Sequence, residues 1–392
     1  MSVILGSLLA IVSFVFLISI VVVIHELGHY WAGRWCGVHA EAFSMGFGPT
    51  LMSWRDKHGT VWRIAALPIG GYVKFLGDAG AASEPDAEKL KELRERMGDA
   101  SDKCYHFKPI WQRAFITAAG PIANFILAIF IFALLAQVYG ERYLEPVVGS
   151  VVEGSPAAEA GFLPGDRITA IGGKSVDRFR DIPTEVSWRP GEELRFEVER
   201  NGETVVIHAA SRLTEVEDRF GGVREIAQLG LGSGPGAQIA ERSYNPFTAV
   251  AHGVNQTWTV VNMTARYVSY VVTLRAPPTM LNGPLGIAEV AGQTAQVSVE
   301  AGRNPAESFY FWLRNMINLA AFLSVGLGLV NLLPIPILDG GHLVYYGYEA
   351  VARRPLSMKA QQLGFQLGLA LVLGMMLLAT WNDINYKLSQ WF

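Results

Sequence analysis

The sequence predicts an α-helical polytopic membrane protein with four transmembrane helices, a membrane-associated β-hairpin and an inserted β-rich domain. Of its 392 residues, 51% are hydrophobic and only 17% are charged, which is typical of membrane proteins rather than of large soluble domains. Four charge-free runs are each long enough to cross a bilayer as a helix. They cover residues 3–24, 114–139, 316–338 and 361–382.

The first run is expected to be retained as a membrane helix. It lacks the basic start and the small-residue exit of a cleaved signal peptide. The formal net charge of −3 gives no indication of nucleic-acid binding. The two cysteines, Cys36 and Cys104, are too few for a disulfide framework.

The end of the first run carries the pattern His-Glu-x-x-His at His25, Glu26 and His29. On a helix, positions i and i+4 share one face, so both imidazoles can hold one zinc ion and Glu26 can serve as general base toward water. Ionisable groups inside a membrane are costly and indicate function. The alternative is a chance pattern of interfacial residues ending a span, and a third ligand elsewhere in the chain distinguishes the two interpretations.

The segments between the first three runs indicate β-structure. Residues 43–74 are punctuated by Gly and Pro and rich in β-formers, which favours a hairpin, either on the cytoplasmic face or dipping toward the active site. Residues 147–213 read as a compact β-rich domain, in which the run 154–168 has a short helix and a tight turn before another strand. Its Asn201-Gly202 pair predicts a hairpin turn.

Basic residues orient the spans. The short loop 353–359 before the last run holds Arg353, Arg354 and Lys359 and no acid, and four basic residues follow the first run, at positions 34, 55, 57 and 63. The positive-inside rule puts both loops in the cytoplasm. The N-terminus, the segment 140–312 and the C-terminus are then expected outside.

The run 253–274 is ambiguous. Its Thr, Asn and Gln residues and Arg266 make it a poor span, so an amphipathic surface helix is favoured. A crossing there would also put Asp339 and the two histidines at opposite ends of their helices, about 30 Å apart. One metal ion could not join them.

A candidate third ligand follows the third run. Pro334 and Pro336 break a helix, and Asp339 comes next, followed by two glycines. Zinc accepts carboxylate oxygen, and a catalytic zinc takes three protein ligands. In the orientation above, the runs that end near His29 and Asp339 both leave the membrane on the cytoplasmic side. His25 and Asp339 can therefore lie at the same depth in the membrane. The alternative for Asp339 is an ordinary helix-terminal turn, and His342 is given no role.

These motifs resemble the site-2 protease family of intramembrane zinc metalloproteases, most closely its bacterial regulator-of-sigma-E protease group. The matching pieces extend over nearly the whole chain. They are His25-Glu-Leu-Gly-His29, Gly120-Pro121-Ile-Ala-Asn124, Gly283-Pro284-Leu-Gly-Ile287, and Asn331 with Pro334 and Asp339-Gly-Gly.

The resemblance implies zinc bound by His25, His29 and Asp339, with Glu26 as the catalytic acid/base. It makes residues 43–74 a re-entrant hairpin that pairs with an unwound substrate. The candidate substrate contacts are Asn331, Gly70, Gly71 and Tyr72. It also implies that 147–213 is an extracytoplasmic PDZ domain. One such repeat is found where well-known enterobacterial relatives carry two, which leaves in doubt any gating scheme that needs two.

The expected organisation has four parts. Residues 1–139 hold the first two spans, the hairpin and a cytoplasmic loop, and residues 147–213 form the PDZ domain. Residues 214–312 are an extracytoplasmic linker with amphipathic helices, and residues 313–392 hold the last two spans. By resemblance, substrates are single-pass membrane proteins such as shortened anti-sigma factors and remnant signal peptides. The expected place is the bacterial inner membrane, with the PDZ domain in the periplasm, the active site near the cytoplasmic side and no nucleic-acid partner. The alternatives are a membrane zinc transporter and a non-catalytic PDZ scaffold.

Overall fold

The computed structural model describes residues 3–78, 95, 102–187, 189–217, 223–234, 239–272 and 283–389. The chain divides into two compact units, which we describe separately. One comprises Met1–Leu135 and Pro246–Phe392, and the other comprises Ala136–Asn245. Most of the expected cytoplasmic loop between the first two spans lies outside the described residues.

Four helices among the described residues are long and apolar enough to cross a membrane, which confirms the number of spans expected. They are α1 (Val3–Trp35), α3 (Ile110–Tyr139), α8 (Pro305–Asn331) and α10 (Met358–Ser389). Helix α6 (Pro246–Val272) is not among them, as its polar residues suggested. A short 3₁₀ turn (Tyr105–Phe107) precedes α3.

The spanning helices pack through small side chains that let their backbones approach. Gly28 of α1 lies against α3, where an added Cβ would stand 2.3 Å from the carbonyl oxygen of Ala119. Helix α6, which is not one of the four, approaches α3 in the same way at Gly253, where an added Cβ would stand 2.5 Å from the carbonyl oxygen of Ile129. Lipid tails are as apolar as the helix surfaces, so the hydrophobic effect does not drive helices together inside a membrane. Close packing at small residues takes its place.

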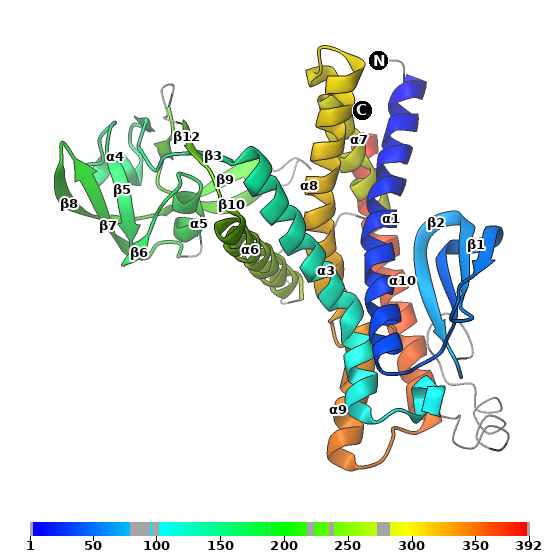
Figure 1. The fold of residues 1–392 in the computed structure, drawn as a ribbon. Helices are drawn as coiled ribbons and strands as arrows, with labels where there is room; N and C mark the ends of the chain where they lie inside the picture. Colours follow the sequence, from blue (N-terminus) through cyan, green and yellow to red (C-terminus); the bar gives the residue numbers. More distant parts are fainter. Residues whose placement is uncertain are drawn as a thin grey trace. The chain divides into compact units, whose positions relative to one another are not determined.

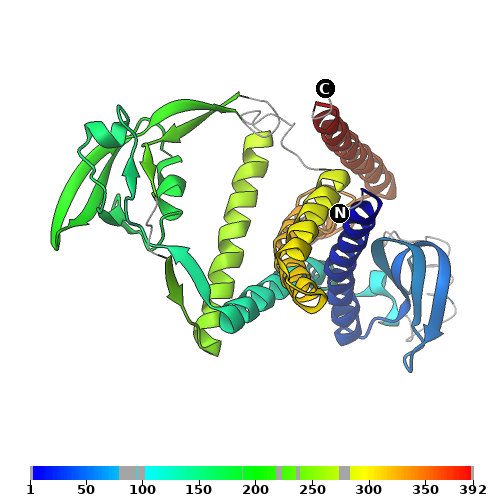
Figure 2. The same cartoon turned by 90° about the horizontal axis from the view of Figure 1, so that it is seen from above.

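Helix α7 (Pro284–Ala301) lies lengthwise against α1 and α8. Its Ala291 and Ala295 are fully buried, and Asn315 of α8 donates a hydrogen bond to Ser298. Residues expected in a linker thus form part of the helical unit. In Figures 1 and 2, α1 stands between the hairpin sheet on one side and α7 and α8 on the other.

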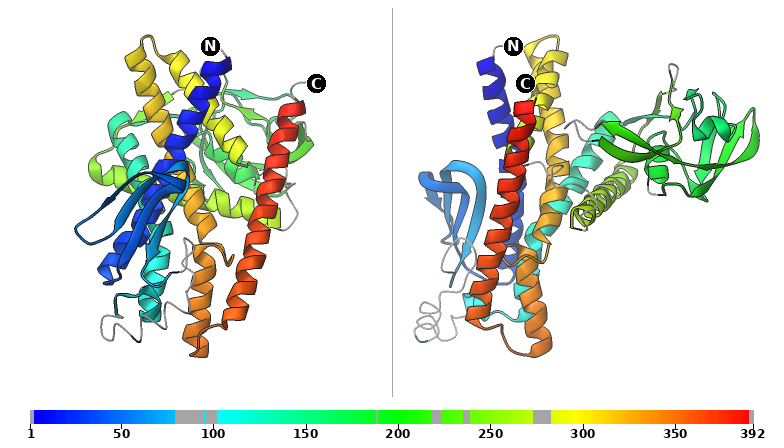
Figure 3. Two further views of the ribbon diagram at one scale, coloured as in Figure 1. Left: turned by 90° about the vertical axis from the view of Figure 1, so that its right-hand side faces the viewer. Right: turned by 180° about the vertical axis from the view of Figure 1, so that it is seen from behind.

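The third span ends earlier than the charge-free run suggested. Helix α8 stops at Asn331, because Pro334 and Pro336 cannot continue its hydrogen bonds. After a short irregular stretch, α9 (Asp339–Ala352) begins at the aspartate itself. Asp339 therefore opens a helix rather than ending one. Figure 3 shows α9 followed by α10, which returns antiparallel to it.

The predicted hairpin is present as β1 (Ala40–Arg55) and β2 (Val61–Phe75), an antiparallel pair. Both strands fold back on themselves, since Phe43 pairs with both Trp62 and Val73, and Trp62 also pairs with Trp54. The result is four short strands in the order 50–55, 61–65, 40–45 and 71–75. The segment 71–75 is thus an edge strand.

Asp56 closes the turn between the two strands. Its carboxylate accepts hydrogen bonds from the backbone of His58 and Thr60, from Trp62 Nε1 and from the hydroxyl of Tyr30 on α1. Burial alone would raise the pKa of Asp56, but the hydrogen bonds of Trp62, His58, Thr60 and Tyr30 lower it to about 2. The turn is thereby tied to α1.

The second unit is a β-rich domain. A four-stranded antiparallel sheet has the order β6-β5-β7-β8, around a core that includes the buried Val148, Ile168 and Phe196. The predicted Asn201-Gly202 turn joins β7 to β8, with both residues at positive φ. The sheet strands are β5 (Arg167–Ile171), β6 (Lys174–Ser175), β7 (Glu193–Arg200) and β8 (Glu203–Ala210).

This unit extends beyond the predicted end at 213. Further strands pair with its first strands, β11 with β4 and β12 with β3, so the chain up to Asn245 belongs to the same compact unit. Long-range pairings of this kind leave no local sequence signal. The remaining elements are β3 (Glu141–Leu144), β4 (Ser150–Val151), α4 (Pro156–Glu159), α5 (Asp181–Ser187), β9 (Arg212–Glu217), β10 (Val223–Gln228), β11 (Leu231–Gly232) and β12 (Ile239–Arg242).

Candidate metal centre

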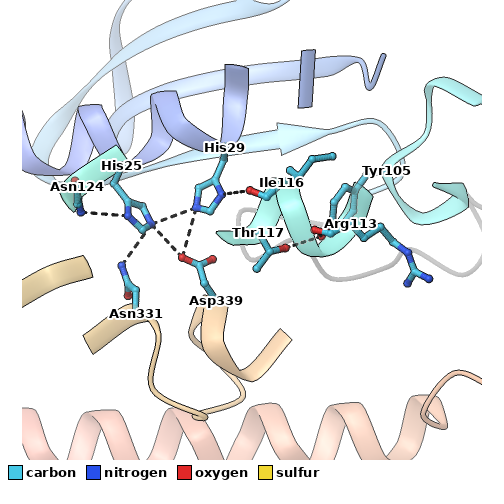
Figure 4. Close-up of polar contacts among 9 residues, drawn as sticks. All are labelled: His25, His29, Tyr105, Arg113, Ile116, Thr117, Asn124, Asn331 and Asp339. Atoms are coloured by element: carbon cyan, nitrogen blue, oxygen red, sulfur yellow. Dashed lines mark hydrogen bonds and ion pairs between the residues drawn. The ribbon is translucent and has the colours of Figure 1, made fainter. Parts of the chain in front are cut away.

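His25, His29 and Asp339 converge on one point, although more than 300 residues separate the first from the last. Their ligand atoms all lie within 4.8 Å of one another. The two Nε2 atoms are 3.2 Å apart, and Asp339 Oδ2 lies 3.3 Å from His25 Nε2 and 3.5 Å from His29 Nε2. Figure 4 shows both rings of α1 facing the carboxylate at the start of α9.

The protonation of His29 follows from its neighbour. Its Nδ1 lies 2.9 Å from the carbonyl oxygen of Ile116 on α3. A carbonyl only accepts, so Nδ1 carries the proton and Nε2 presents its lone pair to the other two groups. Asp339 Oδ2 is buried and accepts no hydrogen bond from the described residues. Lone pairs that face one another in this way repel unless a cation lies between them.

The spacing fits a tetrahedral zinc ion. With zinc–ligand bonds of about 2.0–2.1 Å, the ligand atoms of a tetrahedron stand about 3.3 Å apart. The three separations in this centre are 3.2, 3.3 and 3.5 Å. Two imidazole nitrogens and one carboxylate oxygen are also a donor set of catalytic zinc, which leaves a fourth position for water or substrate.

Gly120 of α3 makes room for the two rings. An added Cβ at this position would stand 2.3 Å from His29 Nε2 and 2.9 Å from His25 Cε1. The sequence motif Gly120-Pro121 therefore serves the centre directly, in addition to helix packing. A side chain there would push the rings apart.

We expect Gly120→Ala to weaken zinc binding at least about 10-fold, because losing even the outer partners of a metal ligand costs that much. Gly326→Ala on α8 is the matched control, since its Cβ would meet no atom within 4 Å. Zinc affinity is measured by chelator competition on both purified variants. Equal affinities in the two variants would contradict the steric argument.

Glu26 lies beside the centre and next to the edge strand. Gly71, Tyr72 and Val73 of β2 line the same cavity as Glu26. Gly71 also lies close, since an added Cβ there would stand 3.3 Å from Glu26 Cγ and 2.8 Å from the carbonyl oxygen of Ser44. Strand β2 thus lies against the Glu26 side chain on one side.

The candidate metal-binding, catalytic and substrate-contacting residues predicted from the sequence all line one cavity of about 280 Å³. They are His25, Glu26, His29, Gly70, Gly71, Tyr72, Asn331 and Asp339. The amide Nδ2 of Asn331 lies 3.4 Å from His25 Nε2. The placement agrees with the roles predicted for them without testing those roles.

The structure adds residues that sequence reasoning left out. His342, set aside earlier, lines the same cavity. Asn124 lies 3.3 Å from His25 Nδ1, and Ile116 holds His29 through its backbone. The Gly120-Pro121…Asn124 motif carried a signal, but its spacing alone did not distinguish helix packing from a role in binding the substrate, and a place beside the metal centre was not predicted.

The chain is similar over nearly its whole length to proteins that are named as metalloproteases. It is 45% identical over 385 residues to metalloprotease MmpA of Caulobacter vibrioides, covering 97% of this chain and 96% of the relative. It is 44% identical over 378 residues to a protein of Agrobacterium fabrum described as a zinc metalloprotease, covering 96% and 95%. A third such protein, from Rhizobium meliloti, is 41% identical over 376 residues, covering 95% and 96%.

The family model of peptidase family M50 matches residues 13–375. This match includes all three converging side chains and Glu26. It also confirms the resemblance noted from the sequence motifs. The chain belongs to peptidase family M50, the site-2 protease family, and is a membrane-embedded metalloprotease by membership.

Proposed function

We propose that this protein is a zinc endopeptidase that cuts single-pass membrane proteins within or near the bilayer. The observation that carries the proposal is the convergence of His25, His29 and Asp339 beside Glu26, with both histidines on a helix long enough to span a membrane. His25, His29 and Asp339 would hold the zinc. A zinc ion held there supplies a Lewis acid and activates water at neutral pH.

Glu26 performs the proton transfers. It lies in the cavity without belonging to the converging ligand set, so its carboxylate is available as a base. It takes a proton from the attacking water and returns it to the leaving amide nitrogen. The amide of Asn331 faces the same point and can donate a hydrogen bond to the substrate carbonyl oxygen as negative charge develops.

The edge strand supplies a way to hold the substrate extended. A transmembrane helix hides its carbonyls in internal hydrogen bonds, so it must unwind before cleavage. Residues 71–75 form the sheet edge next to the metal centre, and an extended chain can add to such an edge as a further strand. Exposed apolar side chains on the hairpin, Leu51, Met52 and Leu67, fit insertion into lipid.

Topology and substrate choice complete the proposal. The basic loop at Arg353, Arg354 and Lys359 supports a cytoplasmic location for the active-site end of the spans in a bacterial inner membrane. The β-rich unit would then be a periplasmic PDZ domain that selects shortened substrates, such as pre-cut anti-sigma factors, or remnant signal peptides. Reaction of a cysteine introduced at Ser357 with an impermeant maleimide in sealed spheroplasts would overturn this orientation.

The test is cleavage of purified single-pass substrates in detergent. We expect a substrate with helix-breaking residues near its cleavage site to be cut faster than a fully helical one. Chelation should abolish both reactions, and added zinc should restore them. Undiminished cleavage after verified removal of zinc would contradict the proposal.

A zinc transporter and a non-catalytic scaffold remain the alternatives. A transporter needs several ligand clusters along a path, and the described residues bring together one such group. A scaffold needs no general base beside the metal. The position of Glu26 therefore favours an enzyme.

A further inference from the structure

We propose that Asn124 is a positioning residue of the metal centre, whose side-chain oxygen accepts a hydrogen bond from His25 Nδ1–H and keeps Nε2 aimed at the metal. The inference rests on the proposed zinc site and deepens it. Asn124 lies on α3, one helical turn beyond Gly120, and is fully buried. Figure 4 shows its amide beside the His25 ring, on the side away from Asp339.

The orientation of His25 requires an acceptor at this place. Its Nε2 faces His29 Nε2 at 3.2 Å and Asp339 Oδ2 at 3.3 Å. A neutral imidazole that gives the lone pair of Nε2 to a metal must carry its proton on Nδ1. That nitrogen therefore needs a partner that accepts, and the Asn124 amide, 3.3 Å away, is the group that the structure places there.

The amide can meet this need through its oxygen. In the structure Nδ2 faces His25 Nδ1, which would set two donors against each other once zinc is bound. Its Oδ1 is buried and has no hydrogen-bond partner among the described residues. The two ends of an amide have nearly the same shape. A half-turn of the amide gives Oδ1 a donor and removes the donor–donor contact.

Helix α3 thus orients both histidine ligands. The carbonyl of Ile116 accepts from His29 Nδ1, and eight residues further along α3 the Asn124 oxygen accepts from His25. Ser324 of α8 donates to the backbone carbonyl of Asn124 and secures α3 at this level. Outer partners of this kind set the tautomer and direction of a metal-bound imidazole.

Two substitutions of similar size separate positioning from packing. Asn124→Asp keeps an acceptor facing His25, whereas Asn124→Leu keeps the volume and removes the hydrogen bond. We expect Asn124→Leu to weaken zinc binding by about 10- to 100-fold and Asn124→Asp to stay near the parent. Ser13→Ala is the control, because it removes a buried hydrogen bond with Trp312 in the same helical unit, remote in sequence from the ligands.

The readout is zinc affinity of the full chain in detergent, by chelator competition, with helical content measured alongside. Rescue by aspartate but not by leucine supports the proposal. Tight zinc binding by Asn124→Leu, or an Asn124→Asp variant as weak as Asn124→Leu, overturns it while leaving the proposed function intact. A parent protein that binds no zinc overturns both.

Discussion

Glu26→Gln is expected to abolish peptide-bond cleavage and to leave the zinc content unchanged. Glu26 lies between His25 and His29 in sequence and lines their cavity, but it is not one of the three converging groups. Glutamine keeps the size and the polarity of the side chain but cannot accept a proton at neutral pH. Loss of a general base costs about 10²- to 10⁴-fold in rate.

The measurement pairs zinc stoichiometry with cleavage of one single-pass substrate. Glu307→Gln is a suitable control, because Glu307 caps the first turn of α8 through the backbone of Arg303 and does not line the cavity. It should cut at the parental rate. Normal turnover by Glu26→Gln would end the metalloprotease mechanism proposed for this centre.

Asp339→Ala is expected to lose zinc as well as activity. Two imidazoles alone leave the site one ligand short of the three that catalytic zinc uses. Removal of an outer partner already costs about 10- to 100-fold in metal affinity, so the loss of a ligand should exceed about 100-fold.

Glu349→Ala is the matched control for this variant. Glu349 lies on α9, the same helix, and pairs with Arg113 rather than with the histidines. It should retain stoichiometric zinc after gel filtration. If Asp339→Ala also retains zinc, the third ligand is another group. The prediction of Asp339 from its expected depth in the membrane, level with His25, would then be wrong.

The membrane helices and the core of the site could be predicted from the sequence because their signals are local. A charge-free run of about 20 residues indicates a span wherever it occurs. His25 and His29 share a face through helix geometry alone. Asp339 was found less directly, from an aspartate after two prolines and from the depth that the basic loops assign to it.

Only the tertiary structure decided which groups complete the centre and where several elements end. Three residues of α3 lie against the histidine rings, namely Gly120, Ile116 and Asn124. Ile116 is 87 residues from His29 in sequence and Asn124 is 99 residues from His25. No local sequence pattern predicts such contacts. The edge strand 71–75 could not be predicted either, because it depends on how both hairpin strands fold back. The β-rich unit extends to Asn245 because its last strands pair with its first ones, which is also a long-range contact. Local chemistry thus predicted the candidate ligands and the candidate base, whereas the close approach of α3 to α1, allowed by two glycines, determined how these side chains are placed.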